Sequence, residues 1–187
     1  MENPGERLVG DFLRHIKGCD FVDFNVYTKR TQGEIDVVGL NHEKKEAFIC
    51  EVVTHLITGI RYVKNGQDVS TDRLIKKFLE DIEYGKGAFA GYAVHYMLWA
   101  PVVRHSEGKP EYNQQLTSVE AKVKAETGIQ IILVVNRDYI NAIKALRDFA
   151  RDETKELKSP IMRFLQIEEW SRKNLTRGSN KPKDPTA

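Results

Sequence analysis

Two apolar segments near the N-terminus each carry one acid where a core strand normally has an aliphatic residue. They are GEIDVVGL (Gly33–Leu40), which contains Asp36, and FICEVVTH (Phe48–His55), which contains Glu51. The charged sequence NHEKKE lies between them and predicts a tight turn. A buried carboxylate is costly unless it is paired or binds a cation. We therefore expect an antiparallel strand pair whose two acids share a partner.

Side-chain alternation predicts that the two acids lie on one face of the sheet. Glu51 shares a face with Ile49 and Val53, and Asp36 shares one with Val38. Neighbouring strands bring facing Cβ atoms to about 4.5–5.5 Å. Two carboxylates at that spacing suit Mg²⁺ or Mn²⁺. Such an ion can polarise a phosphodiester and lower the pKa of an attacking water.

A third acid lies on a predicted N-terminal helix over residues 2–17. Glu6 precedes Val9 by three residues, at the edge of the apolar stripe, so it can reach the same site. Alternatively, Glu6 only stabilises the helix N-terminus through the helix dipole. The stripe consists of Leu8, Val9, Phe12, Leu13 and Ile16.

Hydrophobic periodicity predicts an α/β protein with a mixed central sheet flanked by helices. A hairpin-rich first half, with strands over 21–28, 34–40 and 47–54, leads into a βαβ-like second half. The apolar run over 129–135 predicts a strand that has a parallel neighbour and is buried on both faces. The other predicted elements are a loop over 56–69, helices over 71–84, 111–126, 139–149 and 160–170, and a strand over 92–103.

A chain of 187 residues predicts one domain, over residues 1–170. Residues 171–187 hold five Lys or Arg and one acid, which predicts a basic, disordered tail or, alternatively, a phosphate-binding arm. Cys19 and Cys50 match no metal or redox spacing. The chain shows no signal peptide and no apolar run near 18 residues, so we expect a cytoplasmic protein with no membrane partner.

The segment Pro4–His55 resembles the core of the PD-(D/E)XK nuclease superfamily, which includes restriction endonucleases and Holliday-junction resolvases. The residues that carry the resemblance are Glu6 on the helix, Gly-Glu-Ile-Asp ending at Asp36, and Glu51 near the end of the next apolar strand. The resemblance implies a restriction-endonuclease-like αβββαβ core with extra C-terminal helices. It also implies a Mg²⁺- or Mn²⁺-dependent DNA endonuclease and a possible homodimer. Asp36, Glu51 and the Val52 carbonyl would bind the metal.

The chain departs from this pattern at Val53, where the resemblance implies a lysine that orients the attacking water. Another cation could take that role, either Lys76 or Lys77 on the following helix, or Lys29 or Arg30. We take Lys77 as the catalytic candidate and expect the other three to contact the DNA backbone.

Alternatives to a lysine elsewhere in the chain remain open. His55 could act as proton handler or phosphate contact, or it could be only a capping or loop residue. A two-metal arrangement would make the lysine unnecessary. Catalysis could also be lost, which would leave a nuclease-fold protein that acts as a nucleic-acid-binding or scaffold module. In a last alternative, the chain is an unrelated α/β protein whose Asp36 and Glu51 point to solvent and protect a strand edge.

Overall fold

The computed structural model describes residues 3–27, 33–104 and 113–179. Its elements are α1 (Pro4–His15), β1 (Phe21–Tyr27), β2 (Glu34–Asn41), β3 (Glu46–Val52), β4 (Val63–Lys64), β5 (Gln67–Asp68), α2 (Ser70–Ala88), β6 (Ala93–Ala100), α3 (Gln114–Thr127), β7 (Ile132–Val135), α4 (Arg137–Asp152) and α5 (Pro160–Ser179). The predicted α/β class is confirmed.

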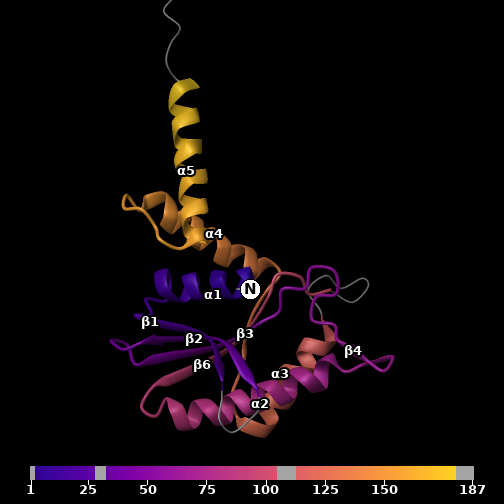
Figure 1. Ribbon diagram of the computed structural model, residues 1–187. Helices are drawn as coiled ribbons and strands as arrows, with labels where there is room; N and C mark the ends of the chain where they lie inside the picture. The colour runs from indigo at the N-terminus through magenta and orange to yellow at the C-terminus, as the bar shows by residue number, and fades with distance from the viewer. Residues whose placement is uncertain (1–2, 28–32, 105–112, 180–187) are drawn as a thin grey trace, which may run out of the picture.

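Five strands form one mixed sheet in the order β1-β2-β3-β6-β7. The β1–β2 and β2–β3 pairs are antiparallel, whereas β6 runs parallel to both β3 and β7. Helices α1 and α4 cover one face of this sheet, and α2 and α3 cover the other (Figure 1). The predicted mixed sheet, with its hairpin-rich first half and βαβ-like second half, is therefore confirmed.

Alternating residues of the strands feed two separate apolar cores. On β3, Ile49 packs with Phe78 of α2 on one side of the sheet. Its neighbour Cys50 packs with Val9 of α1 and with Trp99 on the other side. Because successive side chains of a strand point to opposite faces, an acid at position 51 must lie on the α2 side.

Two predicted segments differ from the structure. Strand β7 is not buried on both faces, since Ile132 is 40% exposed. The reason is its place at the sheet edge, beside β6 alone. The segment over 56–69, predicted as a loop, contains the short β4–β5 hairpin. Its turn has Asn65 and Gly66 at positive φ, the backbone that an Asn-Gly turn favours.

Helix α5 is longer than predicted. It runs to Ser179, so a disordered tail was the wrong prediction for residues 171–179, while residues 180–187 lie outside the described part of the chain. Arg172 lies 2.6 Å from Glu168 one turn earlier, an ion pair that supports helix in this basic stretch. Figure 1 shows α5 rising away from the sheet and its helices. None of the described helices combines the length and apolarity needed to cross a bilayer.

Candidate active site around Asp36, Glu51 and Lys77

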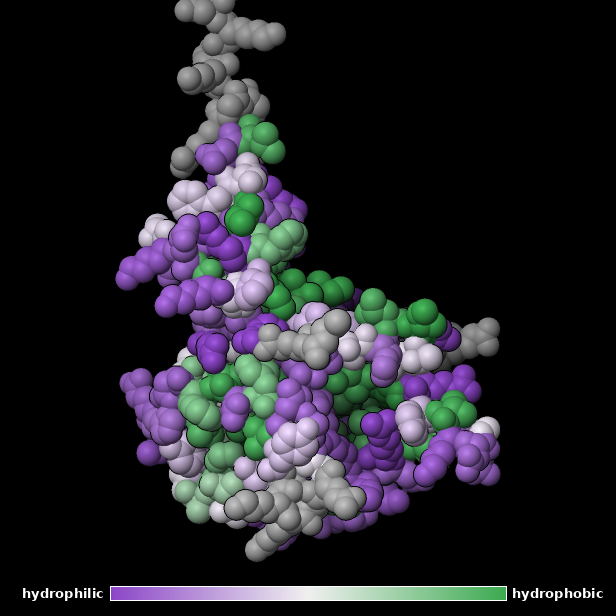
Figure 2. All heavy atoms as spheres, in the orientation of Figure 1, coloured by the Kyte–Doolittle hydropathy of each residue, from purple (hydrophilic) through white to green (hydrophobic). Residues whose placement is uncertain are grey.

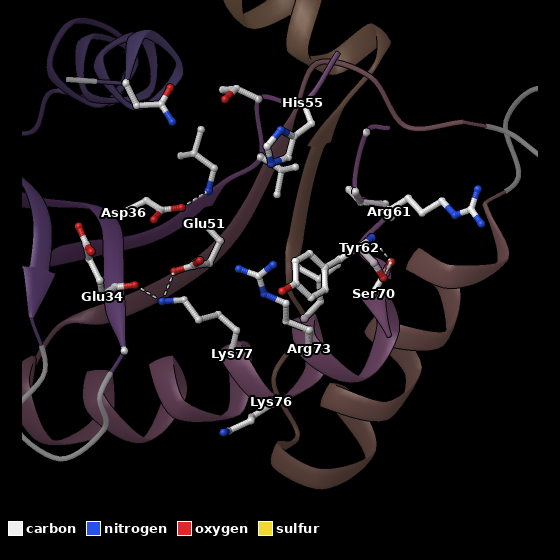
Figure 3. A pocket seen from close by; sticks show the side chains of 18 of the residues that line it. Glu34, Asp36, Glu51, His55, Arg61, Tyr62, Ser70, Arg73, Lys76 and Lys77 are labelled. Carbon is white, nitrogen blue, oxygen red and sulfur yellow. Dashed lines mark hydrogen bonds and ion pairs between the residues drawn. The ribbon is translucent and has the colours of Figure 1, made fainter. Parts of the chain in front are cut away.

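The candidate site lies where β2 and β3 part. Their pairing ends at Val37 and Cys50, and one further step of the same register sets Asp36 opposite Glu51. There the Oδ2 atom of Asp36 accepts the Val52 N–H at 2.7 Å. The carboxylate thus takes the place of a strand carbonyl, which fixes the Asp36 side chain beside Glu51 (Figure 3).

Lys77 of α2 reaches these acids from the helix that covers this face. Its Nζ lies 3.2 Å from Glu51 Oε1 and 4.0 Å from Asp81 Oδ1, and it donates to the Glu34 carbonyl oxygen. Burial lowers the pKa of Lys77, but Glu51 and Asp81 outweigh that effect, so its pKa is raised overall. Lys77 is therefore a cation at neutral pH, held in place by three oxygen partners.

Val53 occupies the position where the resemblance implies lysine. It packs against the apolar cluster beneath α2, together with Ile49 and Phe78. The ammonium group in this site therefore comes from the helix and not from the strand. Lys76, one residue earlier, is 78% exposed at its side chain and lies 3.7 Å from Glu80. In Figure 3 it points away from the acids.

Asp81 is the residue of this site that the sequence analysis missed. It is only 2% exposed, and burial, followed by the charge of Asp36, raises its pKa to about 6, although Lys77 and the Glu51 carboxyl oppose that shift. A signal for it was present. Asp81 follows Phe78 by three residues, so an acid interrupts the apolar stripe of α2.

Glu51 lies on the floor of the site and is 6% exposed. Burial, followed by the charges of Asp36 and Asp81, raises its pKa well above the usual range, against the effect of Lys77. Glu51 Oε1 and Asp81 Oδ2 are both buried without a hydrogen bond of good geometry. Oxygens left in this condition are costly, which is typical of sites that bind a cation or share a proton.

Glu6 faces the other side of Asp36. It is 8% exposed, and burial, then the Asp36 charge, raises its pKa against hydrogen bonds with Asn3 and Asn25. Gly5 makes this approach possible, because a Cβ there would lie 2.1 Å from the Thr54 side chain. Both alternatives for Glu6 are compatible with this position, which is close to Asp36 and also in the first turn of α1.

Asp36 and Glu51 form the floor of an open cavity of about 530 Å³. Val52 and His55 also line it, and His55 is exposed at its rim. Lys29 and Arg30 lie outside the described residues. The opposite wall has further cations and one aromatic ring that the sequence analysis did not single out, Arg61, Tyr62 and Arg73.

Within residues 3–27, 33–104 and 113–179, no three His, Cys, Asp or Glu side chains are arranged as a ready metal site. Lys77 is one reason, because its ammonium lies at ion-pair distance from both Glu51 and Asp81. The donor set itself fits a hard cation: carboxylate oxygens at the floor of a cavity, two of them without a hydrogen bond. Binding would require Lys77 to release Glu51.

Comparison of the chain with protein-family models, with curated proteins and with solved structures found no match. The interpretation of the site therefore depends on its own geometry and chemistry.

Proposed function

We propose that this protein is a metal-dependent endonuclease that hydrolyses phosphodiester bonds in DNA. The observation that supports this most is Lys77, which is held by Glu51 and Asp81 beside Asp36 on the floor of an open cavity. Buried ion pairs add little to stability compared with apolar packing, so the fold alone does not require such a group. Clusters of this kind, with strongly shifted pKa values and an opening to solvent, are typical of active sites.

The acids would hold the metal and Lys77 would act on the substrate. Asp36, Glu51 and the Val52 carbonyl are the proposed ligands for Mg²⁺ or Mn²⁺. The bound metal supplies Lewis-acid polarisation of the phosphate and a lower pKa for the attacking water. The Lys77 ammonium donates to a phosphate oxygen and orients that water, the role that Val53 cannot fill. Glu6, next to Asp36, positions a second water by hydrogen bonding.

Asp81 keeps Lys77 in the site when Glu51 turns to the metal. The two carboxylates share Lys77, so loss of one leaves the other as its partner. Around the cavity, His55, Arg61, Arg73 and Lys76 offer positive or polar groups to the DNA backbone. Such contacts position the strand without reading its sequence.

A catalytically inactive nucleic-acid-binding or scaffold module remains the second candidate, and Val53 is the observation that favours it. The reading in which both acids point to solvent is wrong. Glu51 is buried, and its strand β3 lies between β2 and β6 and not at an edge.

The test is a cleavage assay on linear, supercoiled and branched DNA with Mg²⁺ or Mn²⁺ and with chelator, together with Mn²⁺ titration calorimetry. We expect metal-dependent cleavage that falls by at least about 100-fold in Asp36→Ala and Glu51→Ala, which also lose Mn²⁺ binding. Glu80→Ala is the matched control, since this acid of α2 pairs with the exposed Lys76. Mn²⁺ binding without cleavage of any substrate would favour the inactive module. Loss of both would contradict the proposal.

A further inference from the structure

The wall of the cavity that faces the acids carries a stacked pair of side chains. The Arg73 guanidinium lies over the Tyr62 ring, with Cζ 4.3 Å from the ring centroid. Both residues line the cavity that contains Asp36 and Glu51 (Figure 3). A flat cation on an aromatic ring is a surface on which nucleobases stack, and it also attracts phosphate.

The backbone holds Tyr62 firmly in this place. Its N–H donates to the Ser70 hydroxyl oxygen at 2.6 Å, and its carbonyl accepts the Val69 N–H at 3.0 Å. Ser70 is 1% exposed at the start of α2, whereas Tyr62 keeps 44% of its surface exposed. The ring is thus fixed at its base and accessible at its face, as a binding platform requires.

The depth of the acids limits the shape of the substrate. Glu51 is 6% exposed and lies on the floor of a cavity of about 530 Å³. That volume is within the range of about 300–1,000 Å³ that is usual for small-ligand sites. A nucleotide fits such a space, but a base-paired helix is too wide to enter it. A phosphodiester reaches Glu51 most easily when its strand is unpaired.

The segment that leads to Tyr62 is apolar as well as basic. Leu56 and Ile57, between the lining residues His55 and Gly59, are 68% and 80% exposed. Exposed apolar side chains beside cations suit unstacked bases next to phosphates. The same segment carries Arg61, which lies 3.5 Å from Asp68.

We propose that the substrate enters the cavity as single-stranded DNA, with a base next to the scissile phosphate stacked on the Tyr62–Arg73 pair. This inference rests on the proposed function, because it assigns the substrate class of the same site. The acids act on the phosphate, and the opposite wall holds the base.

Fluorescence anisotropy tests this with a labelled single strand and a fully paired hairpin, in Ca²⁺ in place of Mg²⁺. We expect the single strand to bind about tenfold more tightly or better, as stacking of one base contributes on this order. Tyr62→Leu should weaken single-strand binding by about 5- to 100-fold, whereas Tyr62→Phe, which keeps the ring, should not. Tyr27→Leu is the control, since Tyr27 is 77% exposed on β1 and does not line the cavity.

The outcomes separate this inference from the proposed function. Equal or tighter binding of the hairpin, or full single-strand affinity in a folded Tyr62→Leu variant, would overturn the single-strand assignment. Metal-dependent cleavage of paired DNA alone would also overturn it and would leave the endonuclease standing. If the wild type neither binds Mn²⁺ nor cleaves any DNA, the proposed function fails and this inference fails with it. Circular dichroism of each variant establishes that it is folded.

Discussion

At the scale of single residues, Lys77 is the side chain on which the proposed chemistry depends most. Its side chain is 21% exposed, and its Nζ is shared by Glu51 and Asp81. We expect Lys77→Met to lower the rate of cleavage by about 100- to 1,000-fold, the loss typical of one well-placed donor. The same variant should bind Mn²⁺ at least as tightly as the wild type, because no ammonium competes for Glu51.

Lys76→Met is the matched control for this prediction, since it removes an exposed lysine from the adjacent position of the same helix. It should change DNA affinity slightly and the rate of cleavage little. Wild-type cleavage by Lys77→Met would show that another group orients the water, and His55 would be the next residue to substitute.

Asp81 makes stability depend on pH. Its pKa is raised from 3.8 to about 6 in the folded protein, so the folded state binds the proton more tightly than the unfolded chain does. The associated stabilisation is full below about pH 4 and is lost as the pH rises to about 6. Asp81→Asn removes this loss. Measured by urea unfolding in chelator at pH 7.5, it should be more stable than the wild type by about 1–3 kcal/mol.

The difference between Asp81→Asn and the wild type should shrink toward pH 4, where the carboxyl is protonated in both states. Glu80→Gln, which changes a more exposed acid of the same helix, should show no such pH dependence. A variant that is less stable than the wild type at every pH would mean that the ion pair with Lys77 outweighs burial of the charge.

At the scale of elements, the close approach of α2 to the sheet places Lys77 and Asp81 over β3. Gly85 allows this approach, because a Cβ there would lie 2.3 Å from Tyr96 Oη and 2.9 Å from Ile49 Cδ1. Gly85→Ala should therefore destabilise the protein by about 1–3 kcal/mol, measured by thermal unfolding. It should also lower cleavage, since α2 must shift away from the acids.

Gly87→Ala tests whether this effect is specific to the contact. Gly87 is in the same helix, and a Cβ there would meet nothing within 4 Å. Replacement of a helical glycine by alanine at an open position should stabilise by roughly 0.5–1 kcal/mol. Equal effects of the two substitutions would show that the contact with the sheet is not tight.

At the scale of the whole molecule, α5 is held to the rest by its own small core. Met162 is fully buried in a cluster with Leu146, Ala150 and Leu165, separate from the two cores of the sheet. Other apolar residues of α5 are exposed and appear as green side chains along this helix in Figure 2: Phe164, Ile167, Trp170 and Leu175. The homodimer implied by the resemblance stays a prediction.

Met162→Ala should loosen α5 and leave the site intact. Loss of a fully buried methionine typically costs about 2–5 kcal/mol. The local character of the cluster predicts faster hydrogen exchange in α5 with unchanged Mn²⁺ affinity. If Mn²⁺ affinity falls together with the protection of α5, the α4–α5 pair and the nuclease-like body form a single cooperative unit.

The sequence by itself determined the local elements and the relation of the two strand acids. Alternation over 34–40 and 47–54, with a charged turn between them, requires that Asp36 and Glu51 lie on one face. Periodicity likewise identified the helices within a few residues. These features follow from nearest neighbours along the chain, so they need no knowledge of the fold.

Only the tertiary structure decided which distant residues complete the site. Adjacent helix positions differ by about 100° in direction, so the packing of α2 selects Lys77 and excludes Lys76. The same packing buries Asp81 beside Glu51 and sets the Tyr62–Arg73 pair against the acids. Edge position likewise left β7 partly exposed. Each of these outcomes depends on how elements far apart in the sequence pack, which local patterns do not encode.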